Sequence, residues 1–156
     1  APPANNDDNS SSGGGSDNPG GGNDNPGGNN DDSDDEIMSN KLRITVGSSS
    51  FDATLEDNET VKAFKKLLPM TVNMPDLNRN EKYYYLSGSL PTAASNPGTI
   101  LTGDLMLYGS NCVVLFYESF STSYSYTRLG RVNNSSGLAS ALGSGSVTVT
   151  FELQKE

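Results

Sequence analysis

Residues 112–117 read CVVLFY, and this run of six apolar residues decides what kind of fold the chain can form. Successive side chains of a strand point to opposite faces of its sheet, so a strand of this composition is apolar on both faces. Its shortness and its β-branched and aromatic residues are typical of a fully buried strand rather than a helix. We therefore predict a central strand over 112–118.

The residues before this run follow two different periods. Residues 41–46 read KLRITV, in which apolar residues alternate with charged or hydroxyl residues, as in a half-buried strand. Turn residues at 47–50 and a second alternating stretch at 51–55 predict a β-hairpin. Apolar residues then recur every three or four positions within 61–68, which predicts a helix of about three turns that Pro69 ends.

The remaining segments complete a mainly β fold. A second short helix is expected at 136–142, with Gly143 as its C-terminal stop. Eight strands and two helices predict a closed eight-stranded β-barrel, because closure removes the exposed edges of a sheet. The length of 37–156 suits one domain. The expected strands are 41–46, 51–55, 70–74, 82–86, 104–108, 112–118, 126–132 and 146–153.

The segment 1–36 has a different composition from the rest. It carries nine acidic residues and no basic one, and its only hydrophobic residues are Ala1 and Ala4. A segment with so little apolar surface cannot offset the entropy lost on ordering, so we predict a disordered acidic tether rich in Gly, Asn, Asp and Pro. The remaining acids and bases balance, and the acidic tether would repel phosphate, so we expect no nucleic-acid partner.

The start of the chain suggests where the protein works. Its first residue is Ala rather than Met, from which we expect that a leader has been removed. Acidic, glycine-rich segments directly before a globular domain are common after the lipidated cysteine of bacterial lipoproteins. We therefore expect an extracytoplasmic protein, either a cell-envelope lipoprotein or a secreted one, that contacts a membrane only through a lost N-terminal anchor. An inert N-terminal extension explains the composition equally well.

The composition also excludes several kinds of chemistry. The chain has no His, which removes Ser-His-Asp and Cys-His catalysis and imidazole metal sites. The single cysteine, Cys112, lies in the most apolar strand and is expected to be inert packing. The spacing Asp76-x-Asn78-x-Asn80 is that of an EF-hand, but Glu81 stands where the loop needs Gly, so a polar turn is the better interpretation. We predict no metal and no cofactor.

Several short motifs, in their order along the chain, resemble one protein family. Over about residues 40–154 the chain resembles the bacterial cyclophilin-like domains, often described as cyclophilin-like fold proteins of unknown function. The resemblance implies an eight-stranded barrel with a helix over each end and, in true cyclophilins, a peptidyl-prolyl isomerase site on one outer face. The motifs are Leu67-Leu68-Pro69, Asn80-Glu81-Lys82-Tyr83 with Tyr85-Leu86, Gly103-Asp104-Leu105, Leu115-Phe116-Tyr117 and Arg128-Leu129-Gly130-Arg131.

The sequence departs from the true cyclophilins at the residues that catalyse isomerisation. Those enzymes use an arginine on the third strand, flanked by Phe, Gln, Trp and His. The third expected strand here, 70–74, reads MTVNM, and the whole chain lacks Trp and His. Rotation about a peptide bond has a barrier of about 18–20 kcal/mol, so losing the guanidinium removes the main donor that favours a twisted amide.

Three functions follow as alternatives. The first is a non-enzymatic binding module that takes a small molecule or a peptide in the groove where cyclophilins bind proline. The second is an isomerase with a non-standard site, and the third is a structural or assembly partner without a pocket. For a ligand site we predict an apolar floor of aromatic rings, a guanidinium that holds an anion, and two charged residues at the rim. The six residues are Tyr83, Tyr85 and Phe116 for the floor, Arg128 for the anion, and Glu81 and Lys82 for the rim.

Overall fold

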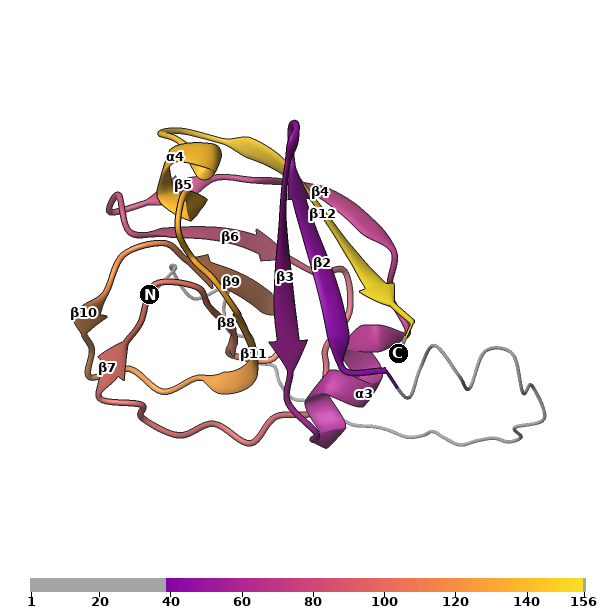
Figure 1. Cartoon of the computed structure of the whole chain (residues 1–156). Helices are drawn as coiled ribbons and strands as arrows, with labels where there is room; N and C mark the ends of the chain where they lie inside the picture. The colour runs from indigo at the N-terminus through magenta and orange to yellow at the C-terminus, as the bar shows by residue number, and fades with distance from the viewer. Residues whose placement is uncertain (1–38, 156) are drawn as a thin grey trace.

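A computed structural model describes residues 39–155, so the tether predicted at 1–36 lies outside the described residues. The described chain is mainly β, as the sequence predicts, with two short helices (Figure 1). Its elements are β2 (Lys41–Val46), β3 (Ser49–Leu55), α3 (Glu59–Lys65), β4 (Met70–Met74), β5 (Asp76–Leu77), β6 (Glu81–Tyr85), β7 (Thr99–Ile100), β8 (Asp104–Tyr108), β9 (Cys112–Phe116), β10 (Phe120–Ser121), β11 (Thr127–Val132), α4 (Leu138–Leu142) and β12 (Val147–Gln154).

One antiparallel sheet forms most of the molecule. Its nine strands follow the order β4-β12-β2-β3-β11-β8-β9-β6-β5, and the sheet curls until β4 and β6 approach each other (Figure 1). The result is a nearly closed barrel, which confirms the predicted architecture. The ninth strand arises at Pro75, which has no backbone N–H to donate and separates β4 from the two-residue β5. The seam is held at this end, where the Tyr83 N–H donates to the Pro75 carbonyl over 3.1 Å.

The interior core follows from the alternation along the strands. Leu42 and Ile44 of β2 are fully buried, and so is Phe151 of β12, which lies opposite Ile44. Phe64 of α3 packs edge-on against Phe151, with ring centroids 6.3 Å apart, and so α3 covers one end of the barrel. α4 covers the other end (Figure 1). No helix in residues 39–155 has the length and apolar character needed to cross a membrane.

The helix α3 is shorter than expected: it runs over Glu59–Lys65, seven residues or about two turns, instead of about three turns within 61–68. Asn58 is its N-cap, and the Asn58 Oδ1 atom accepts a hydrogen bond from the Val61 N–H over 2.8 Å, which satisfies one of the free amides of the first turn. The Asn58 side-chain amide also donates to the Arg128 carbonyl over 3.0 Å. One capping residue therefore ties α3 to β11.

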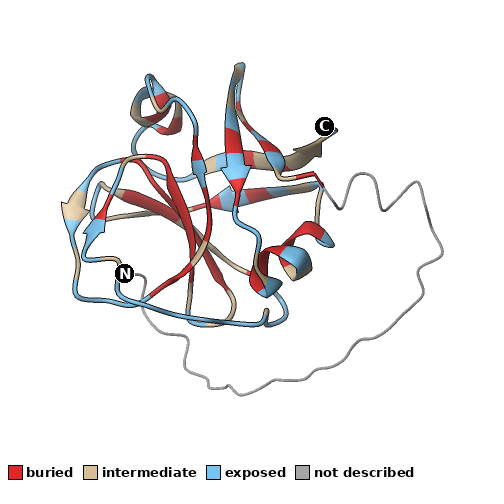
Figure 2. Ribbon diagram, turned by 60° about the horizontal axis from the view of Figure 1, so that its bottom comes forward, coloured by how far each residue is buried: buried red, intermediate tan, exposed pale blue. Residues whose placement is uncertain are grey.

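A second apolar cluster lies outside the barrel. Figure 2 shows β8 and β9 buried along their length, because both faces of these strands are covered. The short antiparallel pair of β7 and β10, which we call the ribbon, covers part of their outer face and contributes the fully buried Ile100. The outer cluster consists of Ile100, Met106, Cys112, Val114, Phe116 and Tyr126, with Tyr83, Tyr85, Tyr108 and Phe120 partly buried against it.

Candidate functional site

The register of four neighbouring strands brings five of the six predicted site residues to one face. On the outer face of β6, β9, β8 and β11, Tyr83 lies beside Val114, Val114 beside Met106, and Met106 beside Arg128. Since residues two apart on a strand share a face, Glu81 and Tyr85 lie on the same side of β6 as Tyr83. Phe116 is the cross-strand partner of Glu81. Lys82 points to the opposite side.

Two of these five residues are enclosed by the chain itself. Phe116 has no exposed surface, and its ring lies 5.7 Å from Phe120 of the ribbon and 5.5 Å from Tyr126. Glu81 is also fully buried rather than at an exposed rim. Burial, together with the charge of Asp76, raises the pKa of the Glu81 carboxyl to about 7. The centre of the outer face is thus filled by protein.

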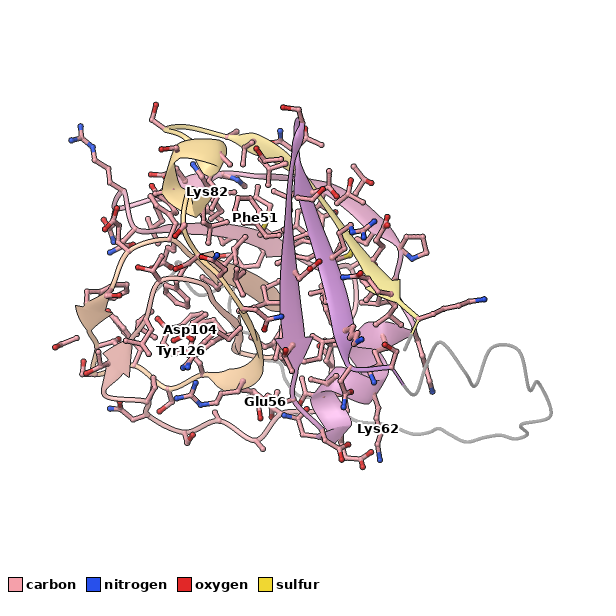
Figure 3. All side chains as sticks on the ribbon, viewed as in Figure 1. Phe51, Glu56, Lys62, Lys82, Asp104 and Tyr126 are labelled. Atoms are coloured by element: carbon pink, nitrogen blue, oxygen red, sulfur yellow. The ribbon has the colours of Figure 1, made fainter. Side chains whose placement is uncertain are left out.

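Lys82 belongs to the closure of the barrel end rather than to a surface site. Its ammonium donates to Asp76 Oδ1 over 3.1 Å and to the carbonyls of Gly143 and Gly145 over 2.8 and 2.5 Å. It also lies 5.2 Å from the centre of the Tyr117 ring. Lys82 is fully buried beneath α4 (Figure 3). These contacts join β6 to the turn that follows α4.

One margin of the outer face is a group of four tyrosines, which we call the tyrosine surface: the partly buried Tyr83, Tyr85 and Tyr108 and the exposed Tyr124. Tyr83 and Tyr85 meet edge-on at 5.7 Å, and Tyr108 meets Tyr124 in the same way at 6.1 Å. Tyr124 is half exposed. Burial raises the pKa of Tyr85 to about 12 and also raises that of Tyr108, so both phenols stay neutral and can donate hydrogen bonds.

The other margin is a groove of about 620 Å³ along β3 and β11, which we call the arginine groove. Within residues 39–155, the Arg128 guanidinium makes no hydrogen bond and no ion pair to another residue. Glu56, which follows the end of β3, also borders the groove (Figure 3). The residues that line it are Thr54, Glu56, Arg128, Gly130, Arg131, Val132 and Asn133.

Arg131 and its partner Asp104 were not among the predicted site residues. The Nε atom of Arg131 lies 2.8 Å from Oδ1 of Asp104, a carboxylate that is 1% exposed. The other carboxylate oxygen of Asp104 accepts from the Leu101 N–H over 2.9 Å, which fixes the chain just after the ribbon strand β7. The signal for both residues was present in the Gly103-Asp104-Leu105 and Arg128–Arg131 motifs, although their roles were not.

A second hollow lies at the barrel seam. It has a volume of about 530 Å³ and opens between β4 and β6, where Met70, Val72, Tyr84 and Leu86 line it together with Leu67, just after α3.

Residues 39–155 contain no group of three or more His, Cys, Asp or Glu side chains placed to hold a metal ion.

The nearly closed barrel with a helix over each end is a mainly β fold of the cyclophilin-like kind. A family model described as the cyclophilin-like family matches residues 44–152, so the chain belongs to the cyclophilin-like family. A hypothetical protein from Archaeoglobus fulgidus has a similar solution structure, with a TM-score of 0.58 and 20% sequence identity over 75% of this chain and 96% of that chain. At this identity the likeness concerns the fold alone. No curated protein matches the chain.

Proposed function

We propose that this cyclophilin-like domain is a non-enzymatic binding module that takes a small molecule or a peptide on its outer face. Because the ribbon fills the middle of that face, the ligand contacts its two margins, the tyrosine surface and the arginine groove. The observation that carries the proposal is Arg128, a guanidinium without a partner among residues 39–155, which lines a groove on the same face as the half-buried Tyr83.

The two margins offer different kinds of interaction. Tyrosine rings provide apolar area at little conformational cost, and their hydroxyl groups provide hydrogen bonds, which is why tyrosine is common in binding surfaces. A guanidinium can hold a carboxylate with two parallel hydrogen bonds. The volume of the arginine groove is in the usual range for small-molecule sites.

We also propose that the protein is extracytoplasmic, either a cell-envelope lipoprotein or a secreted protein, with the acidic residues 1–36 as its tether. The support is the composition of residues 1–36, which combines nine acids with almost no apolar side chain. The test is fractionation of the source cells with an antibody to the domain. Recovery in the cytoplasm would reject the location without affecting the binding proposal.

The binding proposal is tested by titrating the ¹⁵N-labelled full chain with a panel of short peptides and small organic molecules. We expect backbone NMR shifts at Tyr83, Tyr108 and Arg128. A Tyr124→Ser variant should weaken binding, whereas Leu67→Ser, which removes another exposed apolar side chain at the barrel seam, should not. If no compound shifts the NMR signals of residues on the outer face, or if signals shift only at the barrel seam, the proposal is wrong.

An enzymatic role is tested separately with a chromogenic proline peptide. We expect rates equal to the uncatalysed reaction, because no donor is poised over an open apolar hollow on this face: Phe116 is covered by Phe120, and Arg128 lies beyond β8. A rate increase proportional to protein concentration, and lost in Arg128→Gln, would instead identify the domain as an isomerase.

A further inference from the structure

A bulge in β11 changes which side chains share the outer face. Arg128 lies opposite Met106 of β8, whereas Gly130 lies opposite Leu105 and Arg131 opposite Asp104, so β11 has one residue more than β8 over this stretch. In a regular strand, positions 128 and 131 would point to opposite faces. The extra residue shifts the alternation of faces along β11 by one position. Both arginines therefore point outward, while Leu129 remains fully buried in the interior core.

The bulge depends on the glycine within the motif. A Cβ atom built on Gly130 would lie only 2.4 Å from the Thr54 carbonyl oxygen and 3.1 Å from the Leu55 Cα atom. Position 130 therefore allows β3 and β11 to approach more closely than a larger residue would permit. The motif Arg128-Leu129-Gly130-Arg131 thus places two guanidinium groups along one groove.

The two arginines are held in different ways. The Nε–H of Arg131 is bound by the buried Asp104 carboxylate, while its Nη groups have no hydrogen-bond partner among residues 39–155, and its side chain is half exposed. Arg128 is positioned through its backbone, since Asn58 binds its carbonyl, while its guanidinium has no partner there. The Asp104 carboxylate pairs with only one of the two guanidinium groups, so the Arg128 guanidinium has no ion-pair partner among residues 39–155, although Glu56 and Asp104 together make the groove formally neutral.

Two further side chains bear on the kind of anion. The Asn133 Oδ1 atom accepts from the Thr54 hydroxyl over 2.8 Å, which leaves the Asn133 amide hydrogens as additional donors at the same edge. Glu56 adds one negative charge to the lining. Like charges repel, so this carboxylate disfavours a doubly charged phosphate more than a singly charged carboxylate.

We propose that Arg128 and Arg131 form a subsite for a carboxylate group, so that the ligand of this domain is a carboxylate-bearing small molecule or a peptide that binds through its C-terminus. This inference rests on the proposed binding function and specifies the chemistry of one part of the site. The Arg128 fork holds the carboxylate, and the Nη groups of Arg131 add a second, more rigid donor set. In a ligand long enough to reach past the ribbon, an aromatic or apolar part contacts the tyrosine surface.

The test uses two matched pairs of probes that differ only in one charge. The peptide pair is acetyl-Tyr-Gly-Ala with a free C-terminus and the same peptide as its C-terminal amide, and the small-molecule pair is phenylacetate and phenylacetamide. Each is titrated into the ¹⁵N-labelled full chain, with the Arg Nε–Hε and backbone signals observed, and inorganic phosphate is titrated alone. We expect the acid of at least one pair to bind about tenfold more tightly than its amide.

Variants assign this preference to the groove. Arg128→Gln should abolish the preference for the acid, while Arg79→Gln, which removes the same charge from the exposed β5–β6 turn, should keep it. Replacing the ion pair by Arg131→Gln with Asp104→Asn avoids leaving a buried charge alone and should reduce the preference. The pair that shows the preference tells whether the carboxylate comes from a small molecule or from a peptide.

Three results would overturn the carboxylate subsite. The first is that an acid and its amide bind with dissociation constants within twofold of each other and both shift the NMR signals of the tyrosine surface. This result would leave the proposed binding function intact. Another is a preference for the acid that survives in Arg128→Gln. The third is inorganic phosphate binding the groove more tightly than either acid. Absence of binding by every probe and by the whole compound panel would instead reject the binding function itself.

Discussion

Replacing Lys82 by Met tests whether this lysine closes the barrel or belongs to a surface site. Methionine keeps most of the length and volume of the stem and removes only the ammonium group. The change leaves the carbonyls of Gly143 and Gly145 without their donor beneath α4. Asp76 loses one hydrogen bond but keeps those from the Tyr117 hydroxyl and the Arg79 N–H.

The magnitude follows from these contacts. The main cost is the loss of the ion pair with Asp76, because breaking a buried pair by removing one partner costs about 3–5 kcal/mol. The carbonyls of Gly143 and Gly145 add little to this, because both residues are exposed and water can replace the lost donor. Burial alone would raise the pKa of Asp76, but hydrogen bonds from Tyr117 and Lys82 outweigh it and lower the pKa, in agreement with an ionised partner. We expect Lys82→Met to lower the free energy of unfolding by about 3–5 kcal/mol.

The assay is urea unfolding followed by far-UV circular dichroism, since the chain has no Trp for fluorescence. The control is Lys62→Met, because Lys62 is exposed and its ion-pair partner within residues 39–155 is the exposed Glu59. Surface pairs contribute about 0–1 kcal/mol, so this variant should unfold close to the natural protein. If Lys82→Met also unfolds within about 1 kcal/mol of the natural protein, the reasoning is refuted and Lys82 is available to a ligand.

Three further perturbations have expected outcomes. Folding raises the pKa of Glu81 from 4.5 to about 7, so its stabilising contribution is complete below about pH 4.5 and is lost as pH rises through 7. The free energy of unfolding should therefore fall by up to about 3 kcal/mol across that range, and the Glu81→Gln variant should not show this fall. Cys112 is 1% exposed and burial raises its pKa to about 12, so a thiol reagent should label it only in denaturant, and rapid native labelling would contradict the packing of β9. Gly130→Ala should cost at least about 1–3 kcal/mol and move Thr54 amide signals, since its Cβ would meet the β3 backbone; an unchanged melting temperature would exclude that close approach.

The sequence was informative wherever a periodic pattern was reinforced by burial. The alternation in 41–46 predicted the inward residues of β2, and the continuous apolar run predicted that β9 is buried on both faces. The ribbon was not predicted, because β7 and β10 are only two residues long and lie in or beside polar stretches without a period. Their pairing depends on contacts with Phe116 and the outer cluster, which no local pattern encodes.

The candidate site was predictable for strand neighbours and less so for charged groups. Tyr83 and Tyr85 share a face by the period of a strand, which the sequence states directly. Lys82 was expected at the rim of the site, and lysine is seldom buried in proteins. Its acceptors are the carbonyls of Gly143 and Gly145, about 60 residues away, and backbone acceptors leave no signal in a sequence. Arg131 was missed because residues three apart on a regular strand point to opposite faces, which would put Arg131 on the other face from Arg128. A glycine inside a strand is, however, a known sign of a bulge.

The ribbon decides which function the outer face can support. An isomerase needs an apolar hollow that receives a proline ring beside a donor that stabilises the twisted amide. Here Ile100 and Phe120 fill the position over Phe116 with the chain's own side chains, and their burial stabilises the outer cluster. Opening that hollow would expose the ring of Phe116 and the buried Glu81 to water, which costs free energy for the apolar surface. Binding at the two margins requires no such opening, because Tyr124 and Arg131 are already exposed, and this difference is why we propose recognition at the margins rather than catalysis at the centre.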